Sequence, residues 1–212
     1  MNQKETLRYL GYGRQEADDA VRELVAECWR ELERAASPKS VYREFPLAFF
    51  EEDGIDGYGF QTRSKALRKN LKDCERILLF AATLGTGVDV LIQRYSRLQM
   101  SKAVVLQAAA AAMLEDYCDE INEGIRKEYE EKGLFLRPRF SPGYGDFPLT
   151  CQPELIRCLE AGKRVGITLT DSLLMAPSKS VTAVIGVSPV PRLCTVKGCE
   201  ACGKLDCSYR RG

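Results

Sequence analysis

Residues 139–149 read RFSPGYGDFPL, a turn-rich stretch that also carries an arginine, a tyrosine and an aspartate. The proline and glycine in its middle predict a tight turn, because proline fixes φ and glycine accepts positive φ. Backbone groups at such a turn can face a ligand. Arg139 offers a guanidinium fork that suits a carboxylate, and Tyr144 offers a ring that can stack on a flat molecule. The residues leave two interpretations open: a loop that holds an amino acid joined to a nucleoside, or a connecting loop with a structural pair between Arg139 and Asp146.

The segments around this stretch predict a mixture of helices and strands. A long helical pattern over residues 101–133 predicts a helix of about nine turns that ends at Gly133. Further helices are expected at residues 15–36, 64–74, 87–99 and 152–166, and strands at residues 41–50 (one strand or a pair), 76–85, 167–177 and 179–189. Because helices and strands do not alternate regularly, the pattern favours an α+β fold over a doubly wound sheet.

The composition is that of an ordinary globular chain. Its 212 residues are 45% hydrophobic and 29% charged, with a formal net charge of +1. This balance gives no overall field that would favour nucleic acid or a membrane surface as a partner. No apolar run reaches the roughly 20 residues of a membrane helix, and the first ten residues lack the apolar core of a signal peptide. We therefore expect a cytoplasmic protein with neither a nucleic-acid nor a membrane partner.

Two residue counts are unusual. The chain has no histidine, which excludes Ser–His and Cys–His catalysis and histidine-ligated metal sites. It has nine cysteines, and four of them gather near the end of the chain: Cys194, Cys199, Cys202 and Cys207. This spacing suits zinc or an iron–sulfur cluster, and unliganded thiols or a Cys199–Cys202 redox pair are the alternatives. The other five cysteines are expected to be packing residues: Cys28, Cys74, Cys118, Cys151 and Cys158.

Two sequence blocks together resemble a known family. The first, R-x-x-P-G-Y, spans residues 139–144, and the second, G-I-T-L-T-D-S-x-x-M-x-P-x-x-S-V, spans residues 166–181. In order and spacing they resemble the R-P-A-P-G-Y and G-x-x-L-T-E-S-x-A-M-x-P-x-x-S-V-S-G motifs of the reactivation domain of cobalamin-dependent methionine synthase. The likeness covers about residues 115–186. The N-terminal half resembles the shorter, free-standing versions of this domain found in bacteria whose methionine synthase lacks it.

The resemblance implies a fold and a ligand. The family domain is a C-shaped α+β unit with a central twisted antiparallel sheet flanked by helices, and it binds S-adenosylmethionine in a shallow groove. By this resemblance Arg139 would hold the methionine carboxylate, and the backbone near Ser141 and Gly143 would contact the adenine and ribose. Tyr144 would take the catalytic position, close to the donated methyl group and to the cobalt of a docked partner. Glu115, on the long helix, would be a further contact of the ligand.

The chain departs from the family pattern at several places. Ser141 replaces an alanine, which a backbone contact tolerates. Residues 145–148 read GDFP where the family has P-A-C-P-D-H, so the partner contacts made there are not carried over. Residues 180–183 read SVTA instead of S-V-S-G. A family aspartate that contacts the amino group of the ligand has no counterpart.

The resemblance also implies a reaction. Cobalt(I) cobalamin occasionally oxidises to cobalt(II), which cannot accept a methyl group from methyltetrahydrofolate. One electron from a flavodoxin or ferredoxin, coupled to methylation by S-adenosylmethionine, restores methylcobalamin. The protein positions the methyl donor over the cobalt, which needs no acid–base residue. We expect residues 1–190 to form this domain and residues 191–212 a cysteine-rich tail, which as an iron–sulfur site would give the electron an inlet.

The implied function is that of a stand-alone reactivation module, an accessory component of methionine biosynthesis that acts on a corrinoid-bearing methionine synthase lacking this domain. A non-catalytic module that senses S-adenosylmethionine or binds a corrinoid protein, with a structural metal in its tail, is the alternative. An independent methyltransferase is disfavoured, because the sequence has no strand-borne G-x-G-x-G motif and no general base near the first block.

Overall fold

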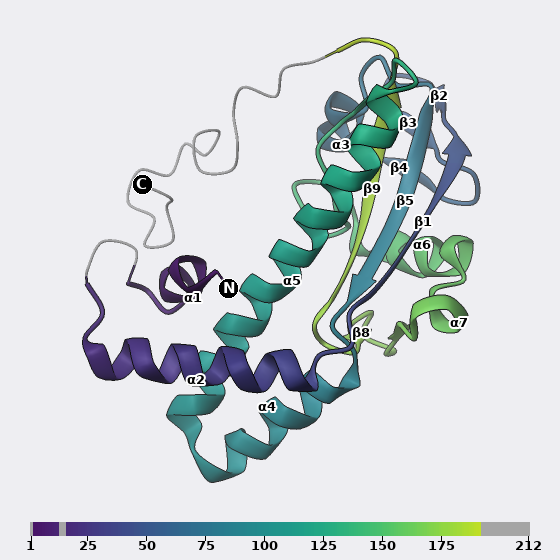
Figure 1. Ribbon diagram of the computed structural model, residues 1–212. Helices are drawn as coiled ribbons and strands as arrows, with labels where there is room; N and C mark the ends of the chain where they lie inside the picture. The colour runs from purple at the N-terminus through teal and green to yellow at the C-terminus, as the bar shows by residue number, and fades with distance from the viewer. Residues whose placement is uncertain (1, 13–15, 192–212) are drawn as a thin grey trace. The chain divides into compact units, whose positions relative to one another are not determined.

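The structure, a computed structural model, describes residues 2–12 and 16–191, which fall into two compact units (Figure 1). The described residues of the helical unit lie within 2–38 and 84–119, and those of the sheet unit within 39–83 and 120–191. The longest described helix, α5 (Met100–Glu130), contributes its first part to the helical unit and its last part to the sheet unit. Strands in the described chain belong to the sheet unit.

The described helical unit is made of helices: α1 (Gln3–Tyr9), α2 (Asp19–Ala35), α4 (Thr86–Leu98) and the first part of α5. The helix expected at residues 15–36 is confirmed as α2. It begins after Asp18, whose side chain caps it by accepting a hydrogen bond from the Val21 N–H at 2.8 Å. One face of α2 is buried: Val25, Cys28, Trp29 and Leu32.

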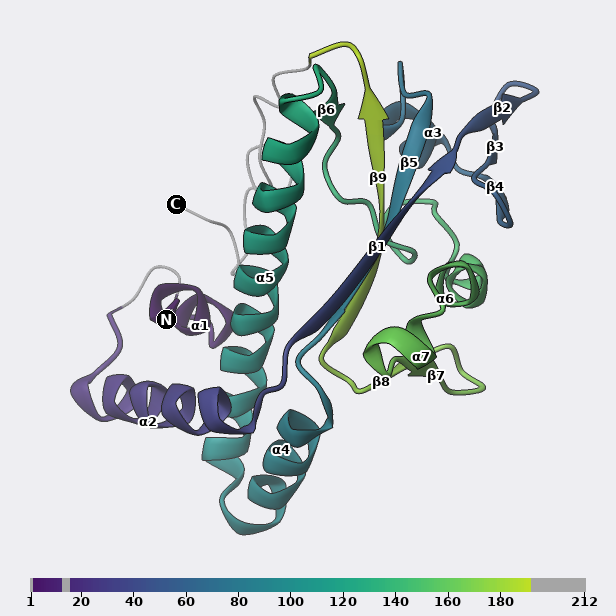
Figure 2. The same cartoon turned by 45° about the vertical axis from the view of Figure 1, so that its right-hand side comes forward.

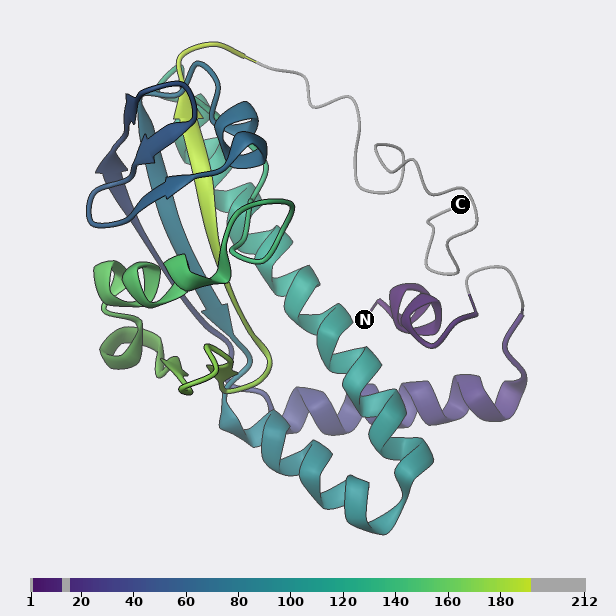
Figure 3. The same cartoon turned by 180° about the vertical axis from the view of Figure 1, so that it is seen from behind.

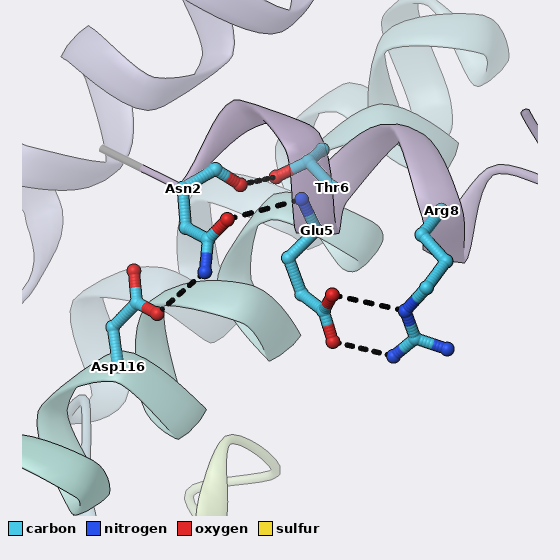
Figure 4. Close-up of polar contacts among 5 residues, drawn as sticks. All are labelled: Asn2, Glu5, Thr6, Arg8 and Asp116. Carbon is cyan, nitrogen blue, oxygen red and sulfur yellow. Dashed lines mark hydrogen bonds and ion pairs between the residues drawn. The ribbon is translucent and has the colours of Figure 1, made fainter. Parts of the chain in front are cut away.

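Side-chain hydrogen bonds attach α1 to its neighbours, and Figure 4 shows the bond to α5. Asn2 caps α1, because its Oδ1 accepts from the Glu5 N–H at 3.1 Å, and its Nδ2 donates to Asp116 of α5 at 2.8 Å. On the other side, the indole Nε1 of Trp29 donates to Thr6 Oγ1 at 3.0 Å in a buried contact. These bonds fix α1 to α2 and to α5 at once, and they satisfy polar groups that burial would otherwise leave unpaired.

A buried lysine connects α2 with α5. The side chain of Lys102 is only 5% exposed, and its Nζ donates to Glu27 at 2.5 Å and to Glu31 at 2.6 Å. The same ammonium group lies 4.3 Å from the ring centroid of Tyr95. Burial acts to lower the pKa of Lys102, but the bonds to the two carboxylates outweigh burial, and the pKa is raised. The lysine is therefore a charged, structural cross-link.

The sheet unit is built on a four-stranded antiparallel sheet in the order β1-β5-β9-β6. Its strands are β1 (Lys39–Pro46), β5 (Arg76–Thr83), β9 (Ser180–Ser188) and β6 (Phe135–Leu136). Almost every residue of β5 and β9 is buried, as expected for central strands covered on both faces. Figure 2 shows β1, β5 and β9 twisting across one another. The predicted α+β fold with a twisted antiparallel sheet is confirmed.

Two neighbouring residues of β1 contact the elements that cover the two faces of this sheet. Glu44 accepts a hydrogen bond from the Tyr129 hydroxyl, in the last part of α5, at 2.7 Å. Arg43 points to the opposite face, as successive strand residues do, and donates to the carbonyl of Cys158 at 2.7 Å. That second face carries α6 (Gln152–Leu159), α7 (Ala161–Val165) and a small sheet of β2 (Ala48–Phe50), β3 (Gly54–Asp56) and β4 (Gln61–Arg63), as seen in Figure 3.

Two predicted elements differ from the structure. Residues 152–166 form α6 and α7 rather than one helix, because Glu160 adopts a left-handed φ of 52° between them. Residues 167–177 form a hairpin, β7 (Thr168–Leu169) and β8 (Met175–Ala176), rather than one strand. None of the described helices is both long and apolar enough to span a bilayer.

Candidate functional site

The turn predicted at Pro142 and Gly143 is confirmed, and it is closed by its own backbone. Gly143 has a φ of 93°, and its N–H donates to the carbonyl of Phe147 at 2.8 Å. The Tyr144 N–H donates to the carbonyl of Ser141 at 3.1 Å, and the Phe147 N–H to the carbonyl of Tyr144 at 3.0 Å. The expectation that the turn leaves its amides open to a ligand is therefore wrong for Gly143 and Tyr144.

The chain on either side of the turn is anchored to the sheet and to the core. Phe140 exchanges two backbone hydrogen bonds with Val184 of β9, both at 2.9 Å. Phe147 is 1% exposed, and its ring centroid lies 6.2 Å from that of Phe60 and 6.3 Å from that of Phe140. Since the loop is attached to β9 at one end and to the core at the other, its conformation depends on residues outside it.

Asp146 joins the turn to α3 (Lys65–Asn70). Its carboxylate accepts hydrogen bonds from the Ser64 hydroxyl at 2.5 Å, from the Lys65 N–H at 2.8 Å and from the Ala66 N–H at 3.1 Å. The bond from the Ser64 hydroxyl, followed by those from the two amides, lowers the pKa of Asp146. The sequence offered Arg139 as the structural partner of this carboxylate, whereas these three bonds come from the start of α3.

The candidate ligand-binding side chains of the turn differ in exposure. Tyr144 is 68% exposed, so its ring and hydroxyl are open to a ligand or a docked partner. Arg139 and Ser141 are half-buried, and the Gly143 backbone is exposed. All four belong to the sheet unit, whereas Glu115, the fifth predicted contact, lies on the part of α5 that belongs to the helical unit.

The second sequence block forms a structural turn within the β7–β8 hairpin. The Thr170 N–H donates to the carbonyl of Leu174 at 2.9 Å, and the Thr170 hydroxyl accepts from the Leu174 N–H at 3.1 Å. Leu173 has a φ of 62°, and its carbonyl accepts a hydrogen bond from the buried amide of Gln152 at 3.0 Å. Gln152 begins α6 directly after the short 3-10 helix η1 (Leu149–Cys151). The side chain of Gln152 thus connects the second block with the segment that follows the first block.

The structure describes five of the nine cysteines and tests only the role predicted for those five. All four predicted metal ligands lie outside the described residues: Cys194, Cys199, Cys202 and Cys207. The other five are buried cysteines outside any disulfide, in agreement with a packing role: Cys28, Cys74, Cys118, Cys151 and Cys158. Burial raises the pKa of the Cys28 thiol to about 11. Within residues 2–12 and 16–191, His, Cys, Asp and Glu side chains form no group of three or more suited to a metal ion.

A separate cleft of ≈ 450 Å³ lies on the α6 side of the sheet unit and contains no residue of either block. It is lined by Arg43, Phe45, Tyr58, Gly59, Arg157 and Cys158. Its two guanidinium groups are already paired, Arg43 with Glu160 at 3.7 Å and Arg157 with Glu154 at 2.6 Å. Because these charges are compensated, the cleft does not define an anion site.

Comparison with known proteins agrees with this arrangement. Residues 66–211 match the family described as vitamin B12 dependent methionine synthase, activation domain. Among solved structures, the fold is similar to one described as the crystal structure of the MetH reactivation domain bound to AdoHcy. That similarity has a TM-score of 0.63 at 19% sequence identity and covers 86% of this chain and 70% of the other. No curated protein matches the chain by sequence.

The fold and the two blocks define a domain of the methionine synthase activation type. Because the family match covers well over half of the chain, the protein belongs to the vitamin B12 dependent methionine synthase activation domain family. The match includes the four cysteines near the end of the chain.

Proposed function

We propose that the chain binds S-adenosylmethionine at residues 139–144 and acts as a reactivation module for a separate cobalamin-dependent methionine synthase. Membership of the activation-domain family is the observation that carries this proposal. The ligand class is supported by the structure of similar fold, which is bound to AdoHcy, the product left when S-adenosylmethionine has given up its methyl group.

The described residues suit this ligand. Arg139 provides a guanidinium for the methionine carboxylate, and the exposed ring of Tyr144 provides a surface beside the donated methyl group. Since the N–H groups of Gly143 and Tyr144 are used within the turn, the adenine and ribose would meet carbonyl groups of the turn and the side chain of Ser141. Glu115 on α5 is the further proposed contact.

In this proposal the partners supply the redox chemistry. A corrinoid-bearing methionine synthase holds the cobalamin, and flavodoxin or ferredoxin provides one electron that reduces cobalt(II) to cobalt(I). S-adenosylmethionine supplies the methyl group to that cobalt and leaves as S-adenosylhomocysteine. Tyr144, the proposed catalytic residue, would lie beside the transferred group. The chain contributes position rather than proton transfer, which is compatible with its lack of histidine.

The proposal includes a division into residues 1–190, the activation-like domain, and residues 191–212, a tail with a metal. Zinc or an iron–sulfur cluster would be held by Cys194, Cys199, Cys202 and Cys207. Metal analysis of the purified full chain, before and after anaerobic reconstitution with iron and sulfide, distinguishes the two metals. A chain that retains neither would refute this part alone.

The test of the proposed function is calorimetric titration of S-adenosylmethionine into the wild type, Arg139→Ala and Arg126→Ala. Loss of a charged hydrogen-bond partner costs about 1.5–3 kcal/mol, so Arg139→Ala should weaken binding roughly tenfold to a hundredfold. Arg126→Ala removes an exposed guanidinium from α5 in the same unit and should bind like the wild type. A folded wild type that does not bind would refute the proposal. Binding without methylation of cobalt(II), once partner and reductant are supplied, would favour the non-catalytic alternative.

A further inference from the structure

A carboxylate that lies outside both sequence blocks holds the proposed binding turn in place. We propose that Asp146 is a positioning residue for S-adenosylmethionine: it caps α3 and thereby fixes the turn that carries Tyr144. The inference rests on the proposed function, because the ligand is the one proposed above. Its structural basis is the set of three hydrogen bonds that Asp146 accepts from residues 80 to 82 positions earlier in the chain.

The start of α3 needs this carboxylate. The first N–H groups of a helix have no partner within it, and the first turn of α3 contains no acidic residue. Ser64 Oγ accepts from the Leu67 N–H at 3.1 Å, which is the usual serine cap. The N–H groups of Lys65 and Ala66 are bound instead by Asp146. Asp146 therefore satisfies the two donors of α3 that its own serine cap does not.

The charge of Asp146 matters as well as its shape. Oδ1 accepts from both the Ser64 hydroxyl and the Ala66 N–H, while Oδ2 accepts from the Lys65 N–H. An asparagine has one acceptor oxygen, so its NH₂ group would face a donor in at least one of these contacts. Asparagine at position 146 fits the space but cannot make all three bonds.

The position of Asp146 in the loop connects this cap to the ligand site. Phe147, the next residue, is buried in the core, and Phe140 is held by β9. Tyr144 lies between these anchors on the exposed part of the loop. Without the bonds of Asp146, Phe147 would still attach the loop to the core, but the segment that carries Tyr144 would lose its hold on α3. We therefore expect Asp146→Asn to lose ligand affinity, which a loss of overall stability alone would not cause.

The experiment compares the wild type, Asp146→Asn and Ile185→Val at neutral pH. Amide hydrogen exchange should be faster in Asp146→Asn at Lys65 and Ala66 and also at Gly143 and Tyr144. Calorimetric affinity for S-adenosylmethionine should fall several-fold, because part of the binding free energy would then be used to order the turn. Ile185→Val shortens a fully buried side chain of β9 and should lower stability without changing affinity. Ser64→Ala removes one of the three donors together with the serine cap of α3, so it should also speed amide exchange at Gly143 and Tyr144.

Each outcome decides the proposal. Unchanged exchange at Gly143 and Tyr144 in Asp146→Asn would overturn it. It would also be overturned if Asp146→Asn and Ile185→Val lost affinity in proportion to their lost stability, since Asp146 would then be merely structural. If the wild type does not bind S-adenosylmethionine, the proposed function fails, and the exchange rates alone then decide whether Asp146 orders the turn.

Discussion

Phe147 is the residue through which the proposed binding turn packs into the core, so replacing it should destabilise the protein strongly. It is 1% exposed and packs against Phe60 and Phe140. Burial of an aromatic side chain removes about 150–250 Å² from water, which at about 25 cal/mol per Å² gives an upper limit of roughly 4–6 kcal/mol. Phe147→Ala is therefore expected to lower the free energy of unfolding by about 3–5 kcal/mol, the range typical of buried aromatic residues.

Phe147→Leu distinguishes the stability contribution of the aromatic ring contacts from that of apolar burial. Phe147→Leu keeps most of the apolar volume but loses two aromatic contacts, each worth about 0.5–1.5 kcal/mol, so we expect a cost of about 1–3 kcal/mol. Urea unfolding followed by circular dichroism measures both variants. Leu98→Ala, at the exposed end of α4, is the control and should stay within about 0.5 kcal/mol of the wild type. A loss below about 1 kcal/mol for Phe147→Ala would refute the reasoning, since the turn would not depend on the core.

The buried lysine of the helical unit gives two further predictions. Lys102→Met should lower the free energy of unfolding by about 1–3 kcal/mol, because charged hydrogen bonds to two part-exposed carboxylates are lost. An unchanged value in denaturant unfolding would mean that the cost of burying the charge offsets the bonds. Burial acts to raise the pKa of Glu31, but hydrogen bonds from Lys102 and Tyr95 lower it overall. The stabilising effect of the Glu31 carboxylate is therefore complete above the pKa of about 4.3 that a glutamate has in the unfolded chain. It is lost as the pH falls through the lower pKa that Glu31 has in the folded protein. Glu31→Gln should show a weaker acid-side loss of stability than the wild type, and parallel pH curves would contradict this.

Elements with a strong local pattern could be predicted from the sequence, and elements shaped by distant contacts could not. β5 contains an uninterrupted apolar run, and α2 has both an apolar stripe and an acidic cap, so the sequence predicts each in the right class. The β7–β8 hairpin was missed, because its turn requires a left-handed backbone at Leu173. Leucine rarely adopts that conformation, and no local rule predicts it.

The same distinction applies to the candidate site. The turn at Pro142 and Gly143 could be predicted, since proline and glycine act on their own backbone. The bonds between Asp146 and the start of α3 could not, because the partners lie 80 to 82 residues apart. The sequence does contain one usable signal. Ser64 precedes a short helical pattern and so predicts a cap, but nothing in the pattern tells which loop supplies the additional acceptor.

The candidate site therefore obtains its shape from residues that are not part of the family motif. The first block supplies a guanidinium and an aromatic ring, and neither can orient a ligand unless the backbone between them is fixed. That backbone is held by β9 through Phe140, by the core through Phe147 and by α3 through Asp146. A function that consists of placing a methyl group over a metal depends on geometry more than on any one reactive group. For such a function, the anchors of the turn should matter to activity as much as the side chains that meet the ligand.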